Sequence, residues 1–268
     1  MFYGILIDYG IKLYQLKPFD KQVAVITGAG QGIGFEIARQ LAQQGAAVIL
    51  NDIQEDLADK AAAEIQTAGG RCYSMNGDAA DVKFIQRMVE EAVKKFGSLT
   101  IAVANAGITL FGDFFEYQSN ALQQVMNVNL GGTFFLAQAA SKQMKKQKSG
   151  GSILFMSSVT GHQAHKDLAA YGMTKAGIEM LAKSLVVELS PYHIAVNAIA
   201  PGATLTSRTN EDSNYEQTWS RITPMGRPAT VDDIAKAALF LISPSSRHIT
   251  GQSLIIDGGW TSVSPSPY

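Results

Sequence analysis

Six short apolar segments recur along the chain, and each is followed by a glycine-rich or polar turn and then by a helical pattern. Their apolar positions are continuous and do not alternate with polar ones, which is typical of strands buried on both faces of a parallel sheet. The segments span residues 23–27, 48–50, 101–103, 153–156, 194–196 and 254–256. Apolar residues between them recur at helical spacing. The expected helices cover 33–44, 54–68, 81–96 with Asp81 as N-cap, about 118–146, 168–190 and 231–242.

This alternation predicts an α/β fold: a single doubly wound, mostly parallel, seven-stranded sheet with helices on both faces, in a Rossmann-like three-layer arrangement. We expect one domain over 20–260. An N-terminal extension, 1–19, would precede it and could add an edge strand, and a tail, 261–268, would follow. The polar stretch 203–229 is long for a connection inside a compact fold, so we expect a substrate lid or a disordered loop there.

Charge and composition narrow the classes of function. With 22 basic and 23 acidic residues the net charge is −1, which gives no electrostatic drive towards nucleic acid or an anionic membrane. A single cysteine, Cys72, excludes an intrachain disulfide, and the four histidines form no HxxxH pair, so no metal site is predicted. No apolar run approaches the roughly 18 residues of a membrane span. We therefore expect a soluble, cytoplasmic protein.

A glycine-rich turn follows the first expected strand, in the run TGAGQGIG at 27–34. A strand, a glycine turn and a helix present bare backbone N–H groups and a positive helix end to a pyrophosphate. Asp52 follows at the end of the second strand, where a carboxylate accepts hydrogen bonds from ribose hydroxyls and would repel a 2′-phosphate. The sequence therefore predicts NAD as cofactor, although a tight turn without a ligand remains the alternative for the glycine run alone.

TGAGQGIG resembles the cofactor loop of the classical short-chain dehydrogenases/reductases, and the resemblance extends over about residues 16–260. Asn129, Ser158 and the run YGMTK, with Tyr171 and Lys175, match the catalytic residues of that family. Ala104 stands where the family often has a second Asn. The loop and the resemblance together imply a cofactor site of Gly28, Gln31, Gly32, Ile33, Gly34, Asp52, Asp78, Ala79, Asn105, Ala106, Gly107, Tyr171, Lys175, Pro201, Gly202, Thr204 and Thr206.

Tyr171 and Lys175 are four residues apart, which places them on one face of a helix. A nearby ammonium favours the phenolate form, so Lys175 is expected to prepare Tyr171 for proton exchange. By resemblance, Lys175 would also bind the nicotinamide ribose, Ser158 would hold the substrate oxygen, and Asn129 would anchor a water molecule that relays protons. Taken singly, each of these residues also has an ordinary structural explanation, such as a turn cap for Ser158.

The resemblance implies an oxidoreductase that transfers hydride between nicotinamide and a secondary alcohol or carbonyl compound. The polar stretch 203–225 and a loop with His162 and His165, which could contact substrate, favour a sugar or polyol, as in glucose 1-dehydrogenase. Three aromatic residues could instead line an apolar pocket, as a 3-oxoacyl thioester reductase would need; they are Phe111, Phe114 and Phe115.

Two other classes of function remain open. One is a catalytically idle nucleotide-sensing protein on the same fold, because fold alone does not decide activity. The other is a scaffold protein that binds partners through residues 1–19 and the tail. The resemblance also implies a homotetramer, a dimer of dimers, in which the helices at 118–146 and 168–190 pair with another subunit.

Overall fold

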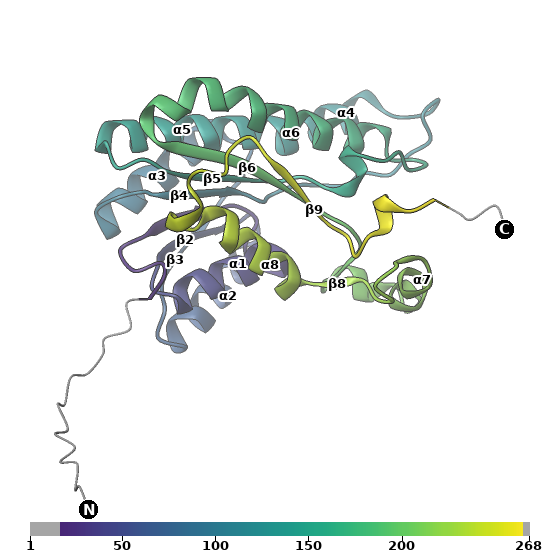
Figure 1. Ribbon diagram of the computed structural model, residues 1–268, viewed down its shortest axis with the longest axis horizontal. Coiled ribbons are helices and arrows are strands. Elements are labelled where there is room, and N and C mark those ends of the chain that lie inside the picture. The colour runs from purple at the N-terminus through teal and green to yellow at the C-terminus, as the bar shows by residue number, and fades with distance from the viewer. Residues whose placement is uncertain (1–16, 265–268) are drawn as a thin grey trace, which may run out of the picture.

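The computed structural model describes residues 17–264 (Figure 1). Within this range seven parallel strands form one sheet in the order β3-β2-β1-β4-β5-β6-β9. The strands are β1 Val23–Ile26, β2 Ala47–Asp52, β3 Arg71–Asn76, β4 Ile101–Ala104, β5 Gly151–Met156, β6 Ile194–Pro201 and β9 Ser253–Ile256. The predicted α/β class and its seven-stranded parallel sheet are therefore confirmed.

Helices cover both faces of this sheet in three layers (Figure 1). On one face lie α1 Gly32–Gln43, α2 Glu55–Thr67 and α8 Val231–Ile242, and on the other lie α3 Val82–Phe96, α5 Thr133–Gln147 and α6 Ala169–Leu189. Successive side chains of a strand point to opposite faces, so Ala24 and Ile26 enter the first core while Val23 and Val25 enter the second. Two cores on opposite faces explain why the strands are continuously apolar.

The direction of strand succession reverses at β1, which pairs with β2 on one side and with β4 on the other. In an open parallel sheet the loops that leave the carboxyl ends of two such strands diverge to opposite faces and leave a crevice between them. The fold therefore places the glycine turn after β1 beside the turn after β4.

Two expected elements differ from the structure. The apolar pattern does not predict β3, because this edge strand is not continuously apolar. It buries Cys72 between the exposed Arg71 and Tyr73. The expected helix 118–146 is divided into α4 Ser119–Val125, a π-helical segment Met126–Gly132, and α5. Such π segments are frequent at functional sites. The close approach of Gly132 to the Ala79 carbonyl, 2.6 Å from where a Cβ would lie, shows how tightly this segment packs.

The segment 203–229 carries regular structure. Strands β7 Thr204–Leu205 and β8 Ala229–Thr230 pair in parallel, and α7 Tyr215–Ile222 lies between them. One 3₁₀ turn within this segment spans Thr209–Glu211, and the 3₁₀ turns elsewhere in the described residues span Val159–Gly161, Ser190–Tyr192, Pro244–Ser246 and Trp260–Ser262. The expectation that the segment 203–229 is a substrate lid stays a prediction.

The structure describes only part of each end of the chain. Residues 1–16 lie outside the described range, and so does any edge strand there, but Phe19 is buried beside α1 and its N–H donates to the Gln44 carbonyl. Residues 265–268 of the expected tail also lie outside it. Among the helices of residues 17–264, none combines the length and the apolar character that crossing a membrane requires.

Candidate active site

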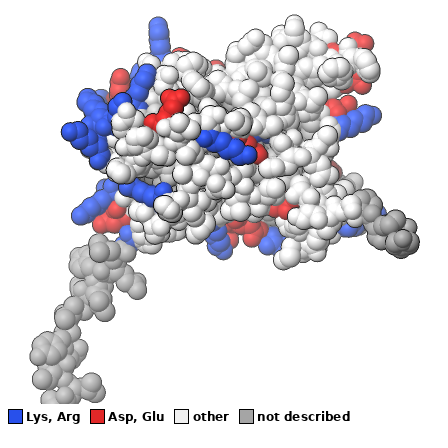
Figure 2. Space-filling view, turned by 45° about the horizontal axis from the view of Figure 1, so that its top comes forward, with Lys and Arg blue, Asp and Glu red and all other residues white. Residues whose placement is uncertain are grey.

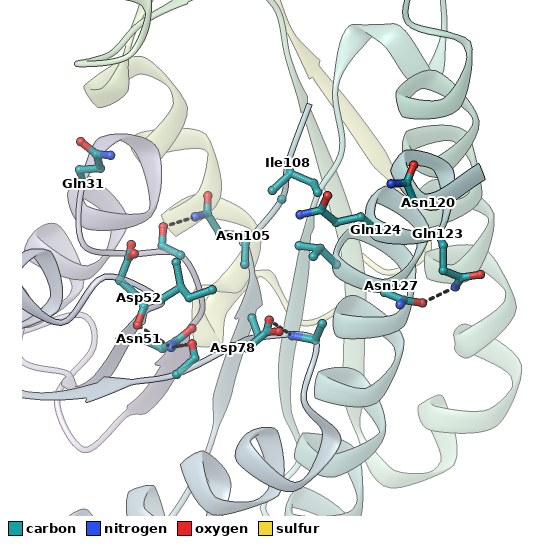
Figure 3. Close-up of a pocket in the computed structure, with 18 residues that line it drawn as sticks. Gln31, Asn51, Asp52, Asp78, Asn105, Ile108, Asn120, Gln123, Gln124 and Asn127 are labelled. Carbon is teal, nitrogen blue, oxygen red and sulfur yellow. Dashed lines mark hydrogen bonds between the residues drawn. The ribbon is translucent and has the colours of Figure 1, made fainter. Parts of the chain in front are cut away.

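A cleft of about 630 Å³ opens at the carboxyl ends of β1, β2, β3 and β4 (Figure 3). It lies at the point where strand succession reverses, as expected for an open parallel sheet. Eight residues that the sequence assigned to the cofactor line it: Gly28, Gln31, Asp52, Asp78, Ala79, Asn105, Ala106 and Gly107. The other assigned cofactor residues do not line the cleft itself.

The glycine turn is clamped to the turn after β4. The Asn105 amide donates to the carbonyls of Thr27 (3.0 Å) and Gly28 (2.6 Å), and the Thr27 hydroxyl accepts from the N–H groups of Asn105 and Ala106 at 3.1 Å. Gly28 has φ +60°, and a Cβ there would lie 2.8 Å from the Ala106 Cα. A Cβ on Gly34 would collide with the Asn105 amide and the Gly28 carbonyl. Side chains are therefore excluded from this cradle, which fits the close approach of a pyrophosphate.

Asp52 ends β2 at the edge of the cleft. One carboxylate oxygen accepts from the Gly30 N–H at 3.0 Å, and the other accepts from the N–H of Gln54, the N-cap of α2, at 3.1 Å. Asp52 is therefore not the N-cap of α2, because its bond goes to the N-cap residue and not to an N–H of the helix, and its carboxylate lines the cleft. Two fixed bonds hold Asp52 where a ribose would meet it, so the residue fits a dinucleotide.

Asp78, which the resemblance assigns to the cofactor site, forms hydrogen bonds within its own turn. Its Oδ1 accepts from the Ala80 N–H at 2.8 Å, and its carbonyl accepts from the N–H of Asp81. Asp81 in turn caps α3 by accepting from the Lys83 N–H, as the sequence predicted. The turn therefore presents a fixed edge to the cleft.

Tyr171 and Lys175 lie on α6, with the Lys175 Nζ 5.3 Å from the centre of the Tyr171 ring. Lys175 is 3% exposed, and its Nζ donates to the Met156 carbonyl at the end of β5 (2.7 Å). A Cβ on Gly107 would lie 3.4 Å from the same Nζ. The buried ammonium is therefore close both to Tyr171 and to a turn that lines the cleft.

Asn129 is fully buried in the π-helical segment. Its Oδ1 accepts from the Ile108 N–H (2.8 Å), and its Nδ2 donates to the Ile108 carbonyl (3.0 Å) and the Thr174 hydroxyl (3.1 Å). The side chain thus satisfies the backbone of the turn after β4 and joins it to α6. Its part in a proton relay stays a prediction.

Ser158 follows β5, and its Oγ accepts from the Thr160 N–H at 3.2 Å, so it caps the turn Val159–Gly161. That turn packs on the first turn of α6, because a Cβ on Gly172 would lie 2.8 Å from the Thr160 carbonyl. A hydroxyl that accepts one bond still has its own proton to donate. The capping role therefore leaves the Ser158 hydroxyl a proton to donate, and its contact with a substrate oxygen stays a prediction.

The segment after β6 closes against the glycine turn. The Ser207 hydroxyl donates to Gln31 Oε1 (2.7 Å), and the Thr206 methyl would lie 3.9 Å from a Cβ on Gly32. Behind it, the Tyr215 hydroxyl of α7 accepts from the Thr204 N–H (3.2 Å). Burial raises the pKa of Tyr215 above its ordinary value, so this phenol stays protonated.

The remaining residues assigned to this region serve its scaffold. Pro201 is the last residue of β6, and the Gly202 N–H donates to the Ile256 carbonyl at the end of β9 (2.9 Å). Ile33 lies in the first turn of α1 and packs against the core on that face of the sheet. Their backbone positions therefore support the closing segment and the glycine turn.

The residues assigned to substrate lie apart from the cleft lining. His162 Nε2 is 2.8 Å from the carboxylate of Glu179, and the His165 ring stacks on Trp260 with centroids 5.1 Å apart. Trp260 also meets Trp219 of α7 edge-on at 5.5 Å. Substrate contact by either histidine stays a prediction. The three candidate pocket aromatics are mostly exposed: Phe111 is 72%, Phe114 76% and Phe115 90% accessible.

Sequence reasoning missed one wall of the cleft. Four amide side chains line it from α4 and the following segment: Asn120, Gln123, Gln124 and Asn127. The helix that carries them lies across the opening from Asp52 and Asn105, and Gln124 points into the opening (Figure 3). Their spacing of i, i+3, i+4 and i+7 marks one helix face and was the available signal. Within residues 17–264, no group of three or more His, Cys, Asp and Glu side chains is arranged to hold a metal ion.

A family model described as enoyl-(acyl carrier protein) reductase matches residues 28–261. The chain belongs to the short-chain dehydrogenase/reductase family. It is 37% identical to an L-rhamnose 1-dehydrogenase (NAD(P)(+)) of Azotobacter vinelandii over 247 residues, which are 90% of this chain and 96% of that relative. It is also 37% identical to a 3-oxoacyl-[acyl-carrier-protein] reductase of Staphylococcus aureus over 239 residues, which are 88% and 96% of the two chains.

A solved structure of the same family agrees with the fold. A gluconate 5-dehydrogenase from Burkholderia cenocepacia J2315, in complex with NADP and tartrate, superimposes with a TM-score of 0.85 at 33% identity. The match covers 93% of this chain and 99% of that one. The protein is therefore an oxidoreductase of the short-chain dehydrogenase/reductase family.

Gly34→Ala tests the cradle. We expect NADH affinity to fall by roughly tenfold or more, because the new methyl displaces Asn105 and separates the two turns. A tenfold loss corresponds to about 1.4 kcal/mol of binding free energy. Fluorescence titration with NADH measures this loss. The matched control is Gly131→Ala, whose Cβ would meet nothing closer than the Met126 carbonyl at 3.8 Å. Equal NADH affinity in both variants would refute the cradle.

Proposed function

We propose that this protein is an NAD-dependent dehydrogenase that interconverts a secondary alcohol and a carbonyl group on a sugar or polyol. One observation carries the proposal: the buried Lys175 ammonium lies close to the Tyr171 ring and also to Gly107, which lines the cleft. This geometry joins a proton-exchanging phenol to a dinucleotide cradle, which is the combination that alcohol oxidation with a nicotinamide needs.

We assign separate roles in the reaction to Tyr171, Lys175 and Ser158. Tyr171 exchanges a proton with the substrate oxygen, and the positive charge of Lys175 favours the phenolate form that accepts it. The Met156 carbonyl holds the Lys175 ammonium in place, and the Ser158 hydroxyl orients the substrate oxygen by donating a hydrogen bond. When bound, the nicotinamide supplies or receives the hydride at its C4.

Two observations support a hydroxyl-rich substrate. Relatives named L-rhamnose 1-dehydrogenase and a structural neighbour named gluconate 5-dehydrogenase act on sugars or sugar acids. The segment that closes on the glycine turn is polar, with Ser207 and Thr209 in its hydrogen-bond network. A glucose 1-dehydrogenase is one member of this class. Reduction of 3-oxoacyl thioesters is the second candidate, because a 3-oxoacyl reductase is equally similar.

A substrate panel tests the proposal. We expect NADH to form from NAD⁺ with at least one of L-rhamnose, D-glucose and D-gluconate, and Tyr171→Phe should lower that kcat by about 10²–10⁴-fold because only the proton carrier is lost. The Phe variant should keep its NADH affinity. Oxidation of NADH by acetoacetyl thioesters alone would favour the second candidate. No turnover of any compound, or a Phe variant with full activity, would contradict the dehydrogenase proposal.

Asp52 supports NAD over NADP. A 2′-phosphate beside this carboxylate would bring like charges together, which at 4 Å and an effective dielectric constant near 20 costs about 4 kcal/mol per charge pair. Gln31 and Ile53 line the same part of the cleft and carry no positive charge, and Ser207 already engages Gln31. A structural neighbour is bound to NADP and a relative is named for NAD(P)(+), so the family uses either cofactor and this chain's own side chains decide the preference.

We expect kcat/KM to be at least about 10²-fold higher with NAD⁺ than with NADP⁺, equivalent to roughly 2.7 kcal/mol. Asp52→Ala combined with Ile53→Arg should narrow or invert this ratio, because it removes the repulsion and adds a phosphate partner. Steady-state kinetics with both cofactors measure it. Asp56→Ala, an exposed carboxylate on α2, is the control and should leave the ratio unchanged. Equal rates with both cofactors in the unmodified protein would refute the role of Asp52.

We also propose a homotetramer, a dimer of dimers. The outer faces of α5 and α6 expose apolar side chains: Phe134 is 45%, Met173 51%, Met180 61% and Val187 81% accessible. On the face in Figure 2, Lys and Arg gather at one end and a broad area carries no charge. Burial of such side chains against another copy would remove apolar surface from water.

Light scattering at micromolar concentration should report a particle about four times the 28.7 kDa of one chain. Val187→Asp with Met180→Asp should reduce the particle mass, because each change would place a charge in the α6 contact. The reference is the unmodified protein at the same concentration. A 28.7 kDa particle for that protein would count against any subunit association.

A further inference from the structure

Glu179 lies one helical turn beyond Lys175 on α6, and its carboxylate is turned away from water. Its side chain is 11% exposed. Oε1 is 2.6 Å from the Ser157 hydroxyl and 2.8 Å from His162 Nε2. Both partners belong to the loop between β5 and α6, so a single carboxylate oxygen holds the start of this loop and a point near its middle.

The loop also packs on α6 without free space. Ser157 is 3% exposed, and its hydroxyl lies 3.0 Å from the Lys175 carbonyl. A Cβ on Gly161 would lie 3.1 Å from Glu179 Oε1 and 3.0 Å from the Ala176 nitrogen. Glycine therefore lets the loop backbone come close enough for the carboxylate to reach both of its partners.

A mostly buried carboxylate is unfavourable unless donors compensate it. Ser157 and His162 supply those donors, and hydrogen bonds to a charged acceptor are stronger than neutral ones. Ser158 directly follows Ser157 and lies between these two anchors. It is the residue of this loop with a proposed role in the reaction. The helix that carries Tyr171 and Lys175 thus also carries the group that fixes the loop of Ser158.

We propose that Glu179 is a positioning residue that holds Ser158 in register with Tyr171 and Lys175, through Ser157 and His162. His162 is then an anchor of this loop and contacts Glu179 instead of substrate. The inference rests on the proposed roles of Ser158 and Tyr171. It adds a carboxylate outside the cleft to the residues on which turnover depends.

Hydrogen exchange tests the positioning without any substrate. The N–H groups of Gly161 and His162 donate to the carbonyls of Ser158 and Val159 at 2.9 Å, so their exchange reports on the loop. We expect Glu179→Leu to speed exchange in a peptide covering 157–163 by at least about tenfold, because the loop loses a charge-assisted anchor. Glu179→Gln keeps an acceptor oxygen and should stay near the unmodified rate.

Glu188→Leu is the matched control, because Glu188 is an exposed carboxylate on the same helix. It should leave exchange in 157–163 unchanged. If Glu179→Leu does not fold, as judged by far-UV circular dichroism, Ser157→Ala with His162→Ala removes both donors and takes its place. Unchanged loop exchange in the folded variant, or equal effects of Glu179→Leu and Glu188→Leu, would overturn the proposal.

Kinetics with NAD⁺ and the best sugar of the panel provide the second readout. Glu179→Leu should lower kcat by about 10–100-fold, as expected for a displaced catalytic group, with NADH affinity within about twofold of the unmodified protein. Glu179→Gln should restore most of the kcat. Full kcat in Glu179→Leu would overturn the inference even where Tyr171→Phe is inactive, whereas an active Tyr171→Phe would refute the proposed function instead.

Discussion

The arrangement of the site depends on the bonds that join the turn after β4 to the glycine turn after β1. These turns leave neighbouring strands at the point where strand succession reverses, and the sheet alone would leave them to diverge. The Asn105 amide and the Thr27 hydroxyl close the gap with four hydrogen bonds. Glycines at 28 and 34 are required because any side chain would push the turns apart.

The same turn then organises the other half of the site. Ile108 directs its N–H and carbonyl to Asn129, and Asn129 passes a further bond to Thr174 on α6. Gly107 leaves room for the Lys175 ammonium. The cradle and the helix of Tyr171 are therefore linked through buried polar contacts, which are costly to leave unpaired and so define one arrangement.

A second group of contacts joins more distant parts of the chain. α7 holds Thr204 through the Tyr215 hydroxyl, and Trp219 of α7 meets Trp260, which stacks on His165. These contacts join the closing segment, the chain after β9 and the loop of Ser158. A site built in this way can change its substrate through a few loop residues while the cradle stays the same.

The parts that the sequence predicted are those whose signal is local. Buried parallel strands are continuously apolar, glycines at 28, 32 and 34 mark a turn that excludes side chains, and Tyr171 and Lys175 share a helix face by spacing alone. The helix over 231–242 appears with the expected bounds, and the Asp81 cap forms as expected. The edge strand β3 was not predicted because half of its residues face water and its pattern is not continuously apolar.

Tertiary structure decided everything that joins residues far apart in the chain. The sequence could not show that Asn129 would bond the backbone of Ile108, that His162 would meet Glu179, or that α4 would lie across the opening from Asp52. The functional groups of these side chains can form hydrogen bonds with several different kinds of partner. The packing of the helices on the sheet selects one of them, because hydrogen bonds form only at separations near 3 Å and no local pattern encodes such a distance.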